Sequence, residues 1–203
     1  MPQGCQNDIK DSYRVCEILG IRSYTINIGS VCSVLYNAID EGYDYDHCCH
    51  NNKGVATNTP ARIRMTTLYA IAALVGGRVC NTGNASEAFI GYTTKYGDLA
   101  GDFALLRNFT VREIYEMGDS MEELPYDLVH KAPTDGMSGK TDEDNTGIPY
   151  DIVDEHLLNG TIPEDVELWE RIKTAHKRNF HKIDAVKLPM PHRATYFHNR
   201  VWD

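Results

Sequence analysis

The chain has 203 residues, of which 42% are hydrophobic, and its formal net charge is −9. This length can bury the core of one domain, and the composition excludes a disordered chain. The acidic balance argues against general attraction to nucleic acid or to an anionic membrane. The longest apolar run, residues 68–75, is far shorter than the roughly 20 residues of a membrane span. The polar start MPQGCQNDIKD is unlike a signal peptide, so we expect a cytoplasmic protein with reduced cysteines.

Histidine and cysteine adjoin one another at His47-Cys48-Cys49-His50, which raises the question of a zinc site. Structural zinc sites usually space their cysteine ligands by two to four residues and need four ligands. Adjacent cysteines do not readily share one ion, and no second cysteine pair with ligand spacing follows. We therefore expect no zinc here.

The first part of the chain predicts a helix, a strand and a second helix. Asp8 can cap a helix over 8–19, in which apolar residues recur near one face. Residues 22–28 (RSYTINI) have an alternating side-chain pattern and are rich in β-branched side chains, which predicts a strand. A second helical pattern covers 31–39, and the polar, turn-rich residues 41–56 predict a surface loop.

The strongest helical pattern follows Asn58-Thr59-Pro60. Asn58 or Thr59 can cap this helix, Pro60 fits its first turn, and Gly76-Gly77 ends it. Residues 78–82 then predict a short strand. Strand, helix and strand in this order predict an α/β fold of parallel βαβ units, with flanking helices that cover the sheet.

The C-terminal half predicts mainly helices. Thr110 and Glu113 form a capping box that opens a helix through Met117. Residues 132–145 are polar and flexible, and two further helices are predicted over 150–158 and 164–178. An aromatic tail broken by prolines follows. We expect a single domain over 1–203, with a C-terminal helical and tail segment from about residue 148.

Polar side chains gather after the predicted strand 78–82. Thr82 ends this strand at the carboxyl edge of a parallel sheet, where ligands of open α/β folds bind. Glu87 could hold Mg²⁺, Lys95 could meet a phosphate or a carboxylate, and Asp102 could accept from ribose hydroxyls. Each residue alone is more simply a solvated charge or a helix cap. The set at one sheet edge favours a binding site.

Several long motifs carry a resemblance to a known family. They are NTPARIRMTTLYAIAALVGG, NTGNASEAFIGYTTKYGDLAGDFALL and KAPTDGMSGKTDEDN. In order along nearly the whole chain, they resemble the ammonia-dependent NAD synthetases, of the ATP pyrophosphatase group. The resemblance implies an adenine-nucleotide α-hydrolase-like (Rossmann-like) fold and a homodimer with the dinucleotide near the interface. Other ATP pyrophosphatases, such as GMP synthetases or tRNA-thiolating enzymes, match less well because they lack the TKYGD block.

The activity that this resemblance implies is a two-step ligation in NAD biosynthesis. The carboxylate of deamido-NAD attacks the α-phosphorus of ATP, pyrophosphate leaves, and an adenylated intermediate forms. Ammonia then displaces AMP and gives NAD. The co-substrate is ATP, and Mg²⁺ neutralises charge on the departing pyrophosphate. The chain has no glutaminase domain, which favours free ammonia or a separate supplier.

The resemblance also implies roles for individual residues. Those it assigns are ATP contacts at Thr82 and Thr134, a magnesium ligand at Glu87, and deamido-NAD contacts at Arg62, Lys95, Asp102, His181 and Lys182. The spacing of Arg62 and Arg64 alone does not decide which of the two faces the ligand. For the late His-Lys pair, His176-Lys177 competes with His181-Lys182, and we favour the latter because it lies nearer the proline-rich tail.

Two departures from the family pattern stand out. Val111 stands where some members carry an ATP-contacting lysine. Arg112 or Lys131 could supply this charge, or the subfamily could do without it. The S-G-G-x-D-S phosphate loop, whose aspartate is a second magnesium ligand, does not occur in these 203 residues. We therefore expect an N-terminally truncated form of the fold. Either Met1 is internal to a longer product, or the chain is an inactive paralogue that binds dinucleotide and dimerises.

Overall fold

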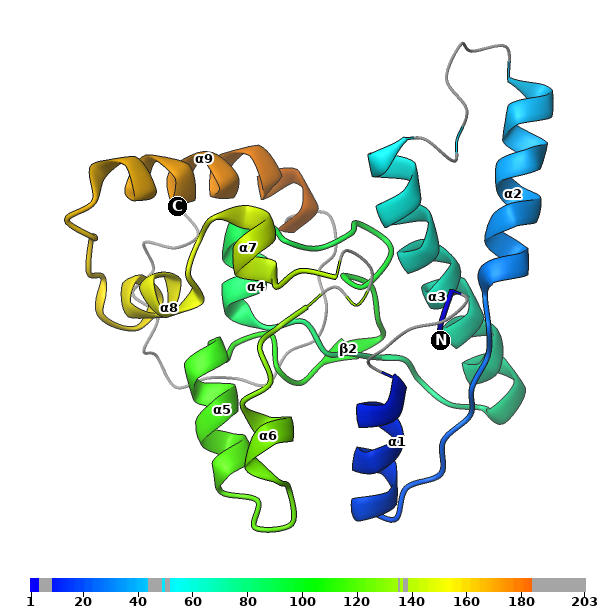
Figure 1. The fold of residues 1–203 in the computed structure, drawn as a ribbon, viewed down its shortest axis with the longest axis horizontal. Coiled ribbons are helices and arrows are strands. Elements are labelled where there is room, and N and C mark those ends of the chain that lie inside the picture. Colours follow the sequence, from blue (N-terminus) through cyan, green and yellow to red (C-terminus); the bar gives the residue numbers. More distant parts are fainter. Residues whose placement is uncertain (4–8, 44–48, 50–51, 135, 137–138, 184–203) are drawn as a thin grey trace.

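The structure, a computed structural model, describes residues 1–3, 9–43, 49, 52–134, 136 and 139–183. In these residues the chain is rich in helices and contains one small parallel sheet (Figure 1). Its elements are α1 (Ile9–Ile18), α2 (Gly29–Gly42), α3 (Lys53–Val75), β1 (Cys80–Asn81), α4 (Ala85–Ile90), β2 (Phe103–Ala104), α5 (Val111–Asp119), α6 (Tyr126–Val129), α7 (Asp142–Thr146), α8 (Tyr150–Asn159) and α9 (Val166–Ile183).

The sheet joins β1 and β2 in parallel, with Cys80 opposite Phe103 and Asn81 opposite Ala104. The helix α4 lies between the two strands in sequence, so the three elements form a βαβ unit. The α/β fold class and the predicted strand over 78–82 are confirmed, although β1 has only two residues. Because this sheet is small, most of the fold depends on packing between helices.

The predicted strand over 22–28 is wrong. In the described part of the chain, residues 22–27 join no strand ladder, and Ile28 N donates to Pro2 O at 2.8 Å. Alternating side chains favour an extended backbone, but a strand also needs a neighbour to accept its N–H groups. This segment is instead an exposed connection whose last residue, Ile28, is buried where α2 begins.

The start of the longest helix also differs from the prediction. The helix α3 begins at Lys53, where the Asn52 side chain accepts from Val55 N at 3.1 Å, so neither Asn58 nor Thr59 is the cap. Pro60 lies inside the helix and is buried. A buried proline ring adds packing, which helps to offset the one backbone hydrogen bond that it removes. The predicted loop 41–56 is therefore helical at both of its ends.

Two clusters of buried side chains hold the helices together. The larger cluster joins α4, α5, α8 and α9, and its buried members are Phe89, Ile90, Val111, Ile148, Tyr150, Val153, Leu157 and Ile172. The smaller one consists of Ile28, Cys32, Tyr36 and Cys49, and Val55 and Ile63 of α3 pack against it. Figure 1 accordingly shows α8 and α9 at one end of the molecule and the α2–α3 pair at the other.

A buried carboxylate fixes the start of α5. Asp154 on α8 accepts from the Ser86 hydroxyl on α4 and from Arg112 N at 2.8 Å, and Val111 N donates to Ser86 Oγ at 3.1 Å. The predicted capping box of Thr110 and Glu113 is confirmed at the same helix end. These contacts hold α4, α5 and α8 together.

The predicted C-terminal helices are confirmed as α8 and α9, and the predicted tail lies outside the described residues. None of the helices within the described ranges has the length and apolar character needed to cross a membrane.

Candidate functional site

A cavity of about 530 Å³ opens at the carboxyl end of β1. It lies between the middle of α3, the start of α4 and the segment that follows α4. Four residues with implied roles line it, namely Thr82, Glu87, Thr134 and Lys182. They come from three separate segments of the chain, because Thr82 and Glu87 both follow β1. The place of this cavity agrees with the expectation that ligands bind where parallel strands end.

Glu87 is held in the wall of this cavity by a second capping box. Its carboxylate accepts from Asn84 N at 2.9 Å, and the Asn84 side chain accepts from Glu87 N at 2.8 Å. Burial raises the pKa of Glu87 to about 7, and the nearby carboxylates of Asp142 and Asp98 add to this effect. Hydrogen bonding to Asn84 and the Arg107 guanidinium oppose it. A cation bound beside Glu87 would therefore stabilise the charged form of its carboxylate.

The donor set around Glu87 suits Mg²⁺. Magnesium usually takes one or two protein carboxylates and completes its shell with water and substrate phosphate oxygens. One Glu87 oxygen bonds Asn84 N, and the carboxylate faces a cavity large enough for phosphate groups. The implied role of Glu87 as a metal ligand is compatible with this geometry.

Asp142 is a further acid in the cavity wall that the sequence reasoning did not single out. It is 4% exposed, and its Oδ2 accepts from Tyr150 Oη at 3.3 Å. Burial, followed by the charges of Glu87 and Asp142, raises the pKa of Tyr150, which keeps its hydroxyl protonated. The motif T-D-E-D in KTDEDN could have pointed to Asp142, because Thr141 and Asp144 form the capping box that starts α7.

Four of the residues with implied dinucleotide contacts, Arg62, Lys95, Asp102 and His181, lie outside the lining of this cavity. Arg62 Nε donates to Lys95 O at 3.2 Å, which brings these two residues together on the surface beside α3. Asp102 Oδ2 accepts from Val79 N at 2.7 Å, so this carboxylate also supports the pairing of β1 with β2. Of the two arginines left open by the sequence, Arg64 lines the cavity and donates to Met1 O at 2.8 Å.

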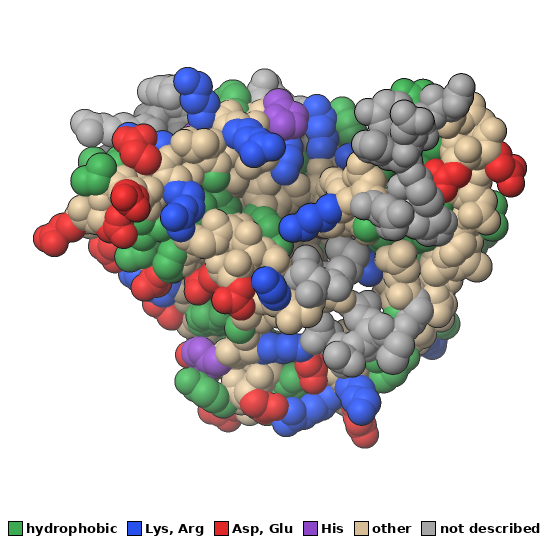
Figure 2. Space-filling view, turned by 45° about the horizontal axis from the view of Figure 1, so that its top comes forward, with side chains coloured by type: hydrophobic (Ala, Val, Ile, Leu, Met, Phe, Trp, Pro, Cys, Tyr) green, Lys and Arg blue, Asp and Glu red, His purple; other side chains and the backbone are tan. Residues whose placement is uncertain are grey.

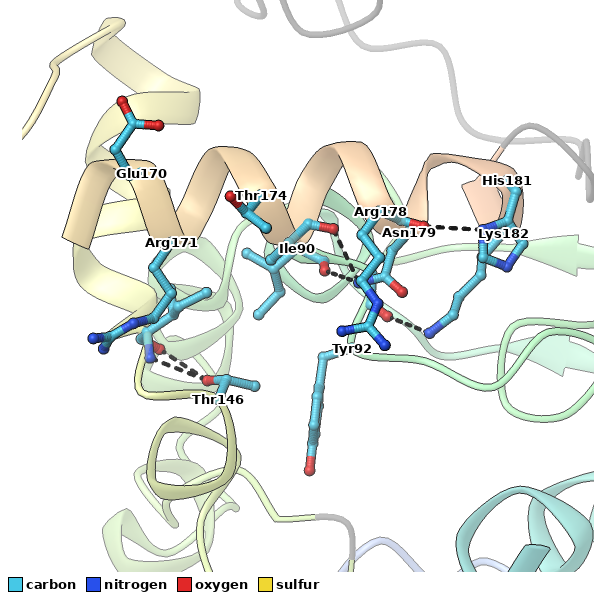
Figure 3. Close-up of a pocket in the computed structure, with 13 residues that line it drawn as sticks. Ile90, Tyr92, Thr146, Glu170, Arg171, Thr174, Arg178, Asn179, His181 and Lys182 are labelled. Carbon is cyan, nitrogen blue, oxygen red and sulfur yellow. Dashed lines mark hydrogen bonds between the residues drawn. The ribbon is translucent and has the colours of Figure 1, made fainter. Parts of the chain in front are cut away.

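The two competing His-Lys pairs differ in their surroundings. His176 stacks on Phe89 with ring centroids 4.4 Å apart, and its Nδ1 bonds Phe89 O at 2.7 Å, so it is part of the packing of α9 on α4. Lys177 is exposed. His181 and Lys182 instead line a groove of about 700 Å³ along α9 (Figure 3).

Lys182 lines both this groove and the cavity around Glu87, Thr82 and Thr134, which we call the Glu87 cavity. The two spaces therefore meet at Lys182. Its Nζ donates to Gly91 O and Thr93 O, each at 2.9 Å. Burial lowers the pKa of Lys182, and the Asp98 carboxylate opposes that shift. The ammonium group is therefore held at the junction by two carbonyl groups.

The two residues expected to replace a lysine at Val111 do not line the Glu87 cavity. Arg112 pairs with Glu155 at 3.1 Å, and Lys131 pairs with Asp11 at 2.5 Å. Val111 itself is buried in the core, so an ATP contact from this position is not available in this chain.

The sequence His47-Cys48-Cys49-His50 lies outside the described residues except for Cys49, which is buried beside Cys32 and Tyr36. Within the described ranges, no group of three or more His, Cys, Asp or Glu residues could hold a metal ion by itself.

Comparison with known proteins assigns the chain to a family. The NAD synthase family model matches residues 1–189. The NH3-dependent NAD+ synthetase of Alkaliphilus metalliredigens is 35% identical over 92% of this chain and 74% of its own length. That of Pyrococcus furiosus is 37% identical over 77% of this chain, and the match spans 58% of the relative.

Solved structures agree with the sequence comparison. The NMN synthetase of Francisella tularensis superposes with a TM-score of 0.78 at 32% identity, over 92% of this chain and 73% of that one. The NH3-dependent NAD synthetase of Campylobacter jejuni gives a TM-score of 0.64 at 28% identity, over 95% and 76% of the two chains. The chain therefore belongs to the NAD synthase family.

Proposed function

We propose that this protein is an ammonia-dependent ligase that amidates deamido-NAD to NAD with the cleavage of ATP to AMP and pyrophosphate. The observation that carries the proposal is the Glu87 cavity. It brings Thr82, Thr134 and Lys182 together with the half-buried carboxylate of Glu87, at the sheet edge where this family's motifs fall. Membership of the NAD synthase family supports the same reaction.

The residues of the cavity divide into two groups by chemistry. The hydroxyls of Thr82 and Thr134 suit ATP, whereas Lys182 suits an anionic group of the pyridine nucleotide at the far side. Glu87 would hold Mg²⁺, which neutralises charge on pyrophosphate when it is bound. Arg62, Lys95, Asp102 and His181 are proposed to contact the remainder of the dinucleotide from outside the cavity.

A second candidate substrate comes from one of the structural relatives. The Francisella tularensis protein is an NMN synthetase, a name that implies a mononucleotide product. The same chemistry on nicotinic acid mononucleotide would give NMN. The two candidates share the carboxylate and the ATP, and they differ in the length of the nucleotide that must be bound.

We also propose a homodimer in the cytoplasm. The outward face of α2 supports the dimer, because Val31, Val34, Leu35 and Ile39 are exposed on it at helical spacing. The described cysteines Cys16, Cys32, Cys49 and Cys80 are free thiols, which suits a reducing compartment.

The reaction is tested by incubating the purified 203-residue chain with Mg-ATP, ammonium and either deamido-NAD or nicotinic acid mononucleotide. The expected result is formation of AMP and NAD in equal amounts, only when ammonium and deamido-NAD are both present. Formation of NMN alone would show that the substrate is the mononucleotide and not the dinucleotide. Binding of deamido-NAD without release of AMP would show that the protein is a dinucleotide-binding module and not a ligase.

A further inference from the structure

The groove along α9 is lined by cations in a chain that is acidic overall. Its wall carries the cations Arg171, Arg178 and Lys182 beside His181, whereas the formal net charge of the chain, with histidine counted as neutral, is −9. The only acid among its described lining residues, Glu170, pairs with Lys173 at 2.6 Å. Figure 2 shows the concentration of Lys and Arg, together with histidine, on the face that α9 presents. Such a groove attracts an anionic ligand.

In the part of the chain that the structure describes, Arg178 differs from Arg171 and Lys182 because its guanidinium has no hydrogen-bond acceptor. Arg171 Nη1 donates to Gly147 O at 2.8 Å, and Lys182 Nζ donates to two carbonyl groups. Among the described residues, the Arg178 guanidinium makes no hydrogen bond and no ion pair. Its side chain extends from α9 toward Tyr92, beside Lys182 (Figure 3). Two like charges therefore face one groove, and a bound anion would relieve their repulsion.

The groove continues into the Glu87 cavity. Gly91, Tyr92 and Lys182 line both spaces, so a ligand that passes Lys182 reaches from one to the other. A reacting carboxylate must lie with ATP in the Glu87 cavity. A mononucleotide ends near this junction, whereas a dinucleotide carries a second phosphate and a second nucleoside beyond it.

We propose that Arg178 is a specificity-determining residue, which binds the phosphate of the non-reacting half of deamido-NAD in the α9 groove. This inference rests on the proposed function, and it names the residue that separates the two candidate substrates. Arginine suits the role because its planar fork can donate two parallel hydrogen bonds to one phosphate. Tyr92 supplies an aromatic surface beside that phosphate.

The test is equilibrium binding of deamido-NAD and of nicotinic acid mononucleotide, by calorimetry, to the full chain and to three variants. Arg178→Gln removes the charge, Arg178→Lys keeps the charge without the fork, and Lys177→Gln is the matched control. Lys177 is the neighbouring exposed cation, and it does not line the groove. Thermal unfolding of each variant verifies that α9 stays folded.

We expect Arg178→Gln to raise the Kd for deamido-NAD by about 10-fold or more, because a charge-assisted bond to phosphate is lost. Its Kd for the mononucleotide should change by less than about 2-fold, since that ligand lacks the second phosphate. Arg178→Lys should fall between wild type and Arg178→Gln, and Lys177→Gln should bind both ligands as wild type does.

An unchanged Kd in Arg178→Gln would overturn the inference, as would an equal loss for both ligands or an equal loss in Lys177→Gln. The outcome is separable from the proposed reaction because binding does not require turnover. A wild-type chain that shows this Arg178 dependence but releases no AMP refutes the reaction and keeps the inference. A chain that makes NAD but shows no effect of Arg178→Gln on binding supports the reaction and refutes the inference. Absence of deamido-NAD binding to wild type refutes both.

Discussion

Glu87 combines two tasks in one side chain, because it caps α4 and faces the Glu87 cavity. Glu87→Gln preserves the capping hydrogen bond, since glutamine also serves at this position of a capping box. It removes the charge that a metal needs. We expect kcat/KM of NAD formation to fall about 100-fold, which corresponds to roughly 3 kcal/mol of transition-state stabilisation.

The matched control is Glu113→Gln, which makes the same change in the capping box of α5, away from the cavity. It should keep the wild-type rate and the wild-type dependence on Mg²⁺ concentration. A Glu87→Gln variant with unaltered magnesium dependence would show that this carboxylate does not hold the metal.

The raised pKa of Glu87 also predicts how stability depends on pH without metal. The pKa is about 7 in the folded chain and near 4.5 when unfolded, so the folded state binds more protons between these values. Stability therefore falls as pH rises through this range, by up to about 3 kcal/mol from this residue. Urea unfolding at pH 5 and pH 8 measures the effect. The Glu87→Gln substitution should be more stabilising, relative to wild type, at pH 8 than at pH 5. A stability difference between the two proteins that does not depend on pH would contradict the assignment.

The contact between α4 and α9 positions both the Glu87 cavity and the groove beside it. Gly91 ends α4 with a φ of +69°, and a Cβ added there would lie 2.0 Å from the Cβ of Asn179 on α9. Gly91→Ala should therefore lose about 2–5 kcal/mol of unfolding free energy, from the left-handed backbone and the clash together. Gly160→Ala is the control, because its φ is +72° and nothing lies within 4 Å. It should lose only about 1–2 kcal/mol in urea unfolding. Equal losses would mean that the α4–α9 contact yields easily.

Local signals predicted the elements that local chemistry determines. The capping box at Thr110 and the polar residues after β1 were readable because each depends on neighbours in sequence. The strand over 22–28 failed because a strand depends on a partner elsewhere in the chain. The start of α3 was misplaced because Pro60, a good first-turn residue, is buried inside the helix.

The same distinction applies to the site. Glu87 and Thr82 follow one strand, so their proximity could be predicted from the motif. Asp142 and Arg178 come from distant segments, and only the folded chain brings them to the Glu87 cavity and its adjoining groove. Likewise, only the folded chain shows that His176 packs on Phe89 whereas His181 lines the groove.

The proposed dimer can be tested by a substitution on α2. The helix buries Cys32 and Tyr36 against α3 and exposes Val31, Val34 and Leu35 on its other side. In a two-fold dimer built on this face, each substitution occurs twice in the interface. Val34→Glu should therefore raise the dimer dissociation constant at least about 100-fold, since each charge loses its water against apolar side chains. Analytical ultracentrifugation measures this.

Val166→Glu is the matched control for that experiment. Val166 is 69% exposed and Val34 is 68% exposed, but Val166 begins α9 at the opposite end of the molecule from α2. The two variants add the same charge to equally exposed valines, so general charge repulsion affects both alike. Dissociation by Val34→Glu alone would place the interface on α2. Equal dissociation by both variants, or a wild-type chain that sediments as a monomer, would show that α2 is not the dimer interface. Its apolar face would then be open to another partner.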